Sequence, residues 1–191
     1  MNEKPILFNA EMVQAILSGR KTQTRRIMGN QPAGQDLETV HVRHNDDFNF
    51  QWYGNLGESS YFPCPLGKPG DQLWVRETWN KHGGLITYRA DHDWIEEMRK
   101  ATVCPAKWVP SLHMPRWASR INLLITGVRV ERLKDISEQD ALAEGVSANE
   151  HSPARYVFGS LWQSIYGADN PKSWQANPWV WVIEFERMEA K

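Results

Sequence analysis

The stretch from residue 179 to residue 185 constrains the possible folds more than any other part of the chain. Its sequence is Trp-Val-Trp-Val-Ile-Glu-Phe, so apolar side chains occupy consecutive positions instead of alternate ones. Successive side chains of a β-strand point to opposite faces of the sheet, and a strand of this kind therefore needs cover on both faces. We expect it to be a central strand of a sheet.

The rest of the chain alternates short strands with short helices. Further strands are expected over residues 5–8, 21–28, 72–76, 85–88 and 121–130, the last with a bend at 126–127. Helices are expected to begin after Asn9, Ser137 and Pro153 and to end at Gly19, Gly145 and Gly167. About five to seven strands with short flanking helices predict an α+β fold, in the form of a partly closed β-barrel.

The length of the chain predicts a single domain over residues 1–191, because it provides for one sizeable core and is too short for two. Two stretches, at about 29–68 and 79–119, are expected to be insertions into this domain. The first is rich in Gly, Asn, Gln and Asp, so it is expected to lie outside the core, with one hairpin inside it. In the second, Asp93 and Glu96 form the capping-box pattern of a short helix.

The charge balance restricts the class of partner. The chain carries 22 Lys and Arg residues against 23 Asp and Glu residues, which gives a formal net charge of −1. Proteins that bind long nucleic acids usually carry a clear basic excess, so this balance favours a small ligand or a short local contact with RNA. The 10 tryptophans are several times the usual share, and they can provide stacking surfaces for planar ligands in addition to core.

The cysteines and histidines show no metal-binding pattern. Cys64 and Cys104 lie far apart, and the six histidines have no paired spacing, so neither a metal site nor a cofactor is expected. The first residues contain no apolar signal core, and no apolar run approaches membrane-spanning length. We therefore expect a cytoplasmic protein without a membrane partner, and the sequence leaves its oligomeric state open.

Four stretches form an ordered pattern along the chain. They cover residues 18–26, 69–75, 133–145 and 180–185. Together they resemble the ASCH family, a group of small β-barrels in the PUA-like superfamily. Gly19, Lys21 and Arg26 match the family signature Gly-x-Lys-x-x-Glu-x-Arg, and Thr24 stands in the place of its Glu. The run at residues 113–120 is similar to versions found in phage and prophage genes.

A threonine at this place resembles the branch of bacterial N4-acetylcytidine amidohydrolases. The resemblance implies a metal-independent enzyme that removes acyl groups from N4 of cytidine or a related nucleoside, and converts N4-acetylcytidine into cytidine and acetate. The catalytic residues that it implies are Lys21, Thr24 and Glu144. The candidate substrate-binding residues are Arg26, Trp74 and Glu77.

The chemistry sets conditions on these residues. Lys21 can act as a base only if its pKa falls well below the usual value of about 10.4, as burial in an apolar pocket achieves. Glu144 can orient Lys21 or hold the departing 4-amino nitrogen, but a carboxylate raises the pKa of a neighbouring lysine, so the assignment of the base stays open. On a regular strand Lys21 and Thr24 point to opposite faces. A shared site therefore requires Lys21 to lie in the turn after Gly19.

Two other functions are compatible with the resemblance. One is a non-catalytic RNA-binding module that uses the same cleft and the basic segment 19–26. The other is an ASCH-type ribonuclease that uses Lys21 on phosphodiesters. Thr24 and the near-neutral charge favour the amidohydrolase, whereas the two long insertions disfavour it because minimal members of that branch lack them.

Overall fold

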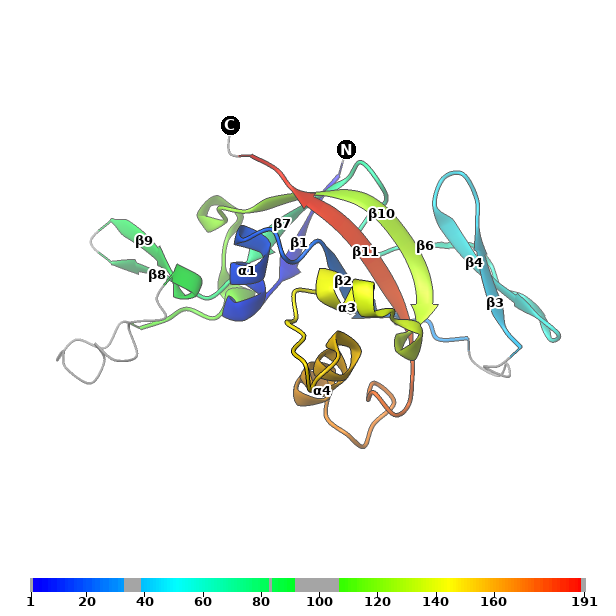
Figure 1. Cartoon of the computed structure of the whole chain (residues 1–191). Coiled ribbons are helices and arrows are strands. Elements are labelled where there is room, and N and C mark those ends of the chain that lie inside the picture. Colours follow the sequence, from blue (N-terminus) through cyan, green and yellow to red (C-terminus); the bar gives the residue numbers. More distant parts are fainter. Residues whose placement is uncertain (1, 33–38, 83, 92–106, 190–191) are drawn as a thin grey trace.

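The computed structural model describes residues 2–32, 39–82, 84–91 and 107–189. These residues form a mixed α+β fold, which confirms the predicted class. Its α-helices are α1 (Ala10–Leu17), α3 (Glu138–Ala143) and α4 (Ala154–Tyr166). The largest sheet has five strands, in the spatial order β1 (Glu3–Leu7), β7 (Gln72–Arg76), β10 (Asn122–Arg132), β11 (Trp179–Arg187) and β2 (Gln23–Ile27) (Figure 1).

Strand β11 has the internal position that its sequence predicts. It pairs antiparallel with β10 on one side and with β2 on the other. Trp181 and Ile183 pack in the main core together with residues of α1. Val180 and Val182 pack on the opposite face, against residues of α3 and α4. The strand is apolar on both faces because it separates two hydrophobic clusters.

The local signals of the sequence are found where they were expected. The side chain of Asn9 accepts a hydrogen bond from the backbone of α1 and caps its first turn. Ser137 and Asp140 form a capping box at the start of α3. The register between β10 and β11 shifts between Ile125 and Gly127, at the predicted bend. These features depend on neighbouring residues alone, which is why the sequence indicates them.

The partly closed barrel is not confirmed, because the sheets do not close into a barrel. β1 and β2 are the two edges of the five-stranded sheet, and α1 connects them in the chain. β1 pairs in parallel with β7, whereas the other neighbouring strands are antiparallel. Two strands that follow one another in the sequence thus lie at opposite edges, an arrangement that hydrophobic patterns do not specify.

The stretch at about 29–68 contributes to the core, and the prediction that it lies outside the core was wrong. It contains the strands β3 (His41–His44), β4 (Asn49–Gly54), β5 (Gly57–Glu58) and β6 (Phe62–Pro63). The ring of Phe50 lies edge-on to Trp181 with the centroids 4.8 Å apart, and Trp52 meets Trp179 at 5.0 Å. The polar composition of the whole stretch concealed the few aromatic residues of β4 that pack against the main sheet.

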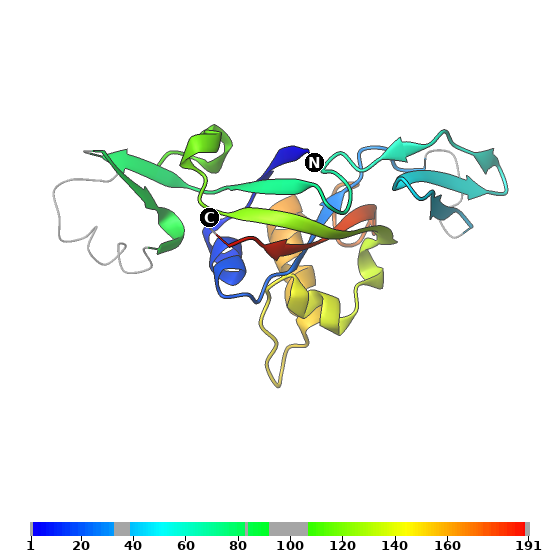
Figure 2. The same cartoon turned by 90° about the horizontal axis from the view of Figure 1, so that it is seen from above.

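The stretch at about 79–119 begins with a hairpin of β8 (Trp79–His82) and β9 (Leu85–Tyr88), which lies at the opposite end of the molecule from β3 and β4 (Figures 1 and 2). Short 3-10 helices follow at η1 (Arg89–Asp91), η2 (Ser111–His113), η3 (Arg116–Ala118) and, after β10, η4 (Leu133–Asp135). The capping box expected at Asp93 and Glu96 lies outside the described residues. Within the described part of the chain, no helix has the length and apolar character needed to cross a membrane.

Candidate functional site

Lys21 lies in the turn between α1 and β2, as a shared site requires. Gly19 ends α1 with a φ of +75°, which glycine adopts without steric cost. The chain then returns along α1, and the backbone nitrogen of Lys21 donates to the carbonyl oxygen of Ala15 at 3.0 Å. Lys21 also forms an isolated bridge with Glu144. Its side chain is therefore outside the alternation of β2 and points toward Glu144.

Lys21 and Glu144 form a buried ion pair. Nζ of Lys21 lies 2.8 Å from Oε2 of Glu144, and it also donates to the backbone oxygen of Glu144 at 2.8 Å. The Lys21 side chain is 0% exposed and the Glu144 side chain is 4% exposed. Removing two charges from water is costly, and their attraction offsets this cost only in part, so such a pair adds little to stability. An ionisable pair of this kind is a candidate for a functional role.

Burial lowers the pKa of Lys21, because apolar surroundings disfavour the charged ammonium. The Glu144 carboxylate opposes this change through its charge and its hydrogen bond, whereas the positive charges of Arg26 and Arg25 add to it. The ring of Phe8 lies near the ammonium, with its centroid 5.6 Å from Nζ. The pKa of Lys21 is lowered overall, which is the direction that a role as a base requires.

The glycine after Glu144 lets the end of α3 approach α1. Glu144 is the C-cap of α3, and Gly145 follows it with a φ of +91°. A Cβ atom at Gly145 would come within 2.9 Å of Cβ of Ala15 and 3.0 Å of Cβ of Lys21. Any side chain here would therefore push α3 away from Lys21. Gly145, which ends α3, is therefore also needed for the Lys21–Glu144 ion pair.

Arg25 belongs to the site, and the sequence analysis missed it. Its side chain is 0% exposed, and Nη1 donates to Oε1 of Glu144 at 3.2 Å. Nη2 donates to Oε2 of Glu131 at 2.9 Å and lies 3.6 Å from Oδ2 of Asp140. The two oxygens of Glu144 thus have different partners, Lys21 and Arg25. The carboxylates that surround Arg25 come from distant parts of the chain, so its sequence neighbours gave no signal of its burial.

Arg26 connects the two edge strands of the sheet and holds Thr24. Its Nη2 donates to the carbonyl oxygen of Leu7 in β1 at 2.9 Å, and its Nη1 donates to Oγ1 of Thr24 at 2.7 Å. Thr24 is fully buried. Its hydroxyl is the acceptor of this bond, so its own proton is not used in it.

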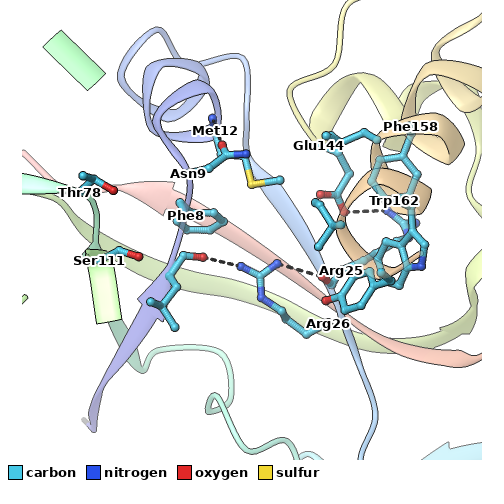
Figure 3. A pocket seen from close by; sticks show the side chains of 14 residues that line it. Phe8, Asn9, Met12, Arg25, Arg26, Thr78, Ser111, Glu144, Phe158 and Trp162 are labelled. Atoms are coloured by element: carbon cyan, nitrogen blue, oxygen red, sulfur yellow. Dashed lines mark hydrogen bonds and ion pairs between the residues drawn. The ribbon is translucent and has the colours of Figure 1, made fainter. Parts of the chain in front are cut away.

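A cavity of about 420 Å³ opens beside Glu144 and Arg26, between the start of α1 and helix α4 (Figure 3). Its polar lining consists of Asn9, Arg25, Arg26, Thr78, Ser111 and Glu144. Its apolar lining consists of Leu7, Phe8, Met12, Phe158, Leu161, Trp162, Ile165 and Tyr166. Lys21 and Thr24 are not among the described residues that line this cavity. Each of them is hydrogen-bonded to a lining residue, Lys21 to Glu144 and Thr24 to Arg26.

Helix α4 accounts for the apolar character of this cavity. Its predicted apolar stripe contains the buried residues Phe158 and Trp162, and also Leu161 and Ile165. Ile165 is 51% exposed, because it lines the cavity and is not packed in a core. The stripe is wider than the core requires, and the surplus faces the cavity.

A second cavity, of about 390 Å³, shares Asn9, Met12, Glu144 and Leu161 with the first. Its described lining contains no aromatic side chain, whereas the first cavity has four, from Phe8, Phe158, Trp162 and Tyr166. Glu144 therefore lies where an aromatic cavity and a non-aromatic cavity meet.

Trp74 and Glu77 do not lie in the described lining of either cavity. Trp74 lies near the guanidinium groups of Arg76 and Arg116, at 5.3 and 5.8 Å from its ring centroid. Glu77 is buried and accepts hydrogen bonds from Arg120 at 2.9 and 3.1 Å. Burial raises the pKa of Glu77, and Arg120 opposes that change. The structure joins Lys21 to Glu144 and Thr24 to Arg26, and it places Trp74 and Glu77 outside the lining of the cavity beside Glu144 and Arg26.

In the described ranges, no group of three or more His, Cys, Asp or Glu side chains is arranged to hold a metal ion. Metal independence stays a prediction.

Comparison of the chain with protein-family models, with curated proteins and with solved structures found no match. The resemblance to the ASCH family rests on the sequence motifs alone.

Proposed function

We propose that the protein is a metal-independent amidohydrolase that removes acyl groups from N4 of cytidine or related nucleosides. The observation that carries this proposal is the Lys21–Glu144 ion pair, which is buried and yet adjoins a cavity of about 420 Å³. Buried ion pairs stabilise a fold poorly, whereas ionisable groups with shifted pKa values beside a cavity are typical of catalytic sites.

The proposed fold is the partly closed barrel of the ASCH family. The hydrogen bond from Arg26 in β2 to Leu7 in β1 supports it, because one side chain spans the distance between the two edge strands. The sheet therefore curves enough to bring its edges near each other without direct pairing of β1 and β2.

The proposed reaction has two steps, in which neutral Lys21 is the base. Oγ1 of Thr24 attacks the carbonyl carbon of the acyl group while Lys21 takes the hydroxyl proton. Lys21 gives this proton to N4 as the C–N bond breaks, which releases cytidine and leaves the acyl group on Thr24 as an ester. Water then attacks the ester, Lys21 takes its proton and returns it to Thr24, and the carboxylic acid leaves. Glu144 orients Lys21 throughout.

The surroundings of Thr24 suit this chemistry. Arg26 places a positive charge 2.7 Å from Oγ1 of Thr24, which favours transfer of the hydroxyl proton to Lys21. Lys21 and Thr24 do not line the cavity themselves, but each is hydrogen-bonded to a residue that does. Catalytic hydrogen bonds are often completed only when substrate is bound. The aromatic side chains of Phe8, Trp162 and Tyr166 offer flat apolar surfaces to a pyrimidine ring.

The purified protein is expected to convert N4-acetylcytidine into cytidine and acetate, and exhaustive treatment with EDTA is expected to leave the rate unchanged. The reason is that the proposed step uses a lysine, a threonine and an arginine, without a metal-bound water. Chromatographic separation of N4-acetylcytidine from cytidine measures the reaction directly, with heat-unfolded protein as the control.

Two results would contradict this expectation in different ways. Loss of activity with EDTA and its recovery with zinc would exclude the proposed mechanism but would not contradict the proposed substrate class. Absence of turnover, together with submicromolar RNA binding that weakens steeply with salt, would instead support a non-catalytic RNA-binding module.

Thr24→Val is expected to lower kcat for N4-acetylcytidine about a hundredfold, because it keeps the shape of the side chain and removes only the nucleophilic hydroxyl. The double variant Lys21→Met/Thr24→Val is expected to be little worse than either single variant, since both residues serve the same step. Steady-state kinetics of the three variants checks this. A near-normal rate for Thr24→Val would mean that Lys21 activates a water molecule directly.

A further inference from the structure

Glu144 divides its carboxylate between two buried cations. Oε2 accepts from Lys21 at 2.8 Å, and Oε1 accepts from Arg25 at 3.2 Å. The side chains of both cations are 0% exposed. We propose that Arg25 is a positioning residue for Lys21, because it binds one oxygen of Glu144, turns the other toward Lys21 and withdraws part of the carboxylate's charge from it. The significance of this role for catalysis rests on the proposed function.

The need for such a residue follows from the conflict between burial and pairing. A buried lysine loses its proton more easily, but a carboxylate that serves this lysine alone holds the proton in place. A second cation on the same carboxylate weakens that hold, and it also repels the lysine's positive charge. The charged groups that act on Lys21 are Glu144, Arg25 and Arg26. Arg25 and Arg26 both lower the pKa of Lys21, but only Arg25 does so while bound to Glu144 itself.

An arginine is suited to this position because its planar fork can serve two acceptors in fixed directions. Nη1 of Arg25 faces Glu144, and Nη2 faces Glu131 at 2.9 Å, with Asp140 at 3.6 Å. The acidic groups beyond Arg25 therefore hold its guanidinium in place against Glu144. A lysine carries a single point charge and cannot hold both sides of this arrangement at once.

Arg129 offers a matched control within the same network. It binds Glu131, Asp140 and Glu184, and no hydrogen bond or ion pair between Arg129 and Glu144 is found in the described structure. Removing Arg129 thus deletes the same charge from the same cluster without touching the carboxylate that Lys21 uses. A general electrostatic effect of the cluster would respond to both arginines, whereas a positioning role through Glu144 responds to Arg25 alone.

The test compares Arg25→Met, Arg25→Lys and Arg129→Met with the natural protein. The titration of the Lys21 side chain is followed by NMR of isotope-labelled lysine without substrate, and kcat/KM for N4-acetylcytidine is measured as a function of pH. In Arg25→Met, we expect the Lys21 midpoint and the rising limb of the kcat/KM profile to move to higher pH. Activity at pH 7 should fall about tenfold and recover in more alkaline buffer. Arg129→Met should leave the midpoint in place.

Arg25→Lys keeps the test decisive if Arg25→Met does not fold, because the positive charge remains in the cluster. The midpoint of Lys21 is expected to rise because one of the two forked contacts is lost. The rise should be smaller than in Arg25→Met because the positive charge is kept. An unchanged midpoint in the folded Arg25 variants, or an equal change in Arg129→Met, would overturn the inference. The midpoint is measured without substrate, so a protein that hydrolyses no N4-acylcytidine would refute the proposed function and leave this inference to be judged by NMR.

Discussion

Lys21→Met is expected to lower kcat/KM for N4-acetylcytidine at least about a hundredfold, the scale of losing a positioned acid–base group. Methionine keeps most of the apolar stem of the side chain, and it removes only the ammonium that lies near Phe8. Glu144 retains Arg25 as a partner, so its buried carboxylate is not left without a cation. The variant should therefore fold while losing the base.

The matched control for this experiment is Lys172→Met, which makes the same substitution at an exposed lysine. It should keep the full rate. Steady-state kinetics, with circular dichroism to verify folding, measures both variants. If folded Lys21→Met retains more than a tenth of the natural rate, Lys21 is not the base.

Glu144→Gln is expected to lower the free energy of unfolding by about 3 to 5 kcal/mol, the usual cost of removing one partner of a buried ion pair. The change removes the negative charge from between Lys21 and Arg25, and both cations are fully buried. Lys21 can respond by losing its proton, but the guanidinium of Arg25 would then face a neutral amide in place of the carboxylate. Lys21→Met should cost clearly less, because it leaves the Glu144–Arg25 contact in place.

Urea unfolding at constant m-value measures this difference, and Glu186→Gln at an exposed site of β11 serves as the control. The double variant Lys21→Met/Glu144→Gln is expected to recover part of the loss, since it no longer buries an unpaired ammonium. Equal losses for Lys21→Met and Glu144→Gln would mean that Arg25 does not share the carboxylate.

The sequence predicted the parts of the fold that depend on neighbouring residues. Asn9 and Ser137 cap helices as expected, Gly19 and Gly145 follow helix ends, and β11 lies inside the sheet. Each of these follows from backbone chemistry or side-chain alternation within a few residues. The condition that Lys21 lie in the turn before β2 was also recognised, because strand geometry alone imposes it.

The features that sequence analysis missed depend on contacts between distant residues. The burial of Arg25 requires Glu131 and Glu144, which are more than 100 positions away in the chain. The first insertion was expected outside the core because its average composition is polar, but the packing of Phe50 depends on Trp181. Trp74 and Glu77 were proposed at the site from their sequence alone, and the structure places them away from the cavity. The substrate-binding role suggested for them remains a prediction.

The pairing of β2 also determines when during synthesis the site can assemble. β2 carries Thr24 and Arg26 near the beginning of the chain, and its only strand partner in the described structure is β11, the last strand in chain order. A ribosome therefore releases β2 long before the strand that supports it exists. Until β11 emerges, β2 has no strand to pair with, and its charged side chains cannot be buried. β2 therefore gains its strand partner only after β11, the last described strand in chain order, has left the ribosome.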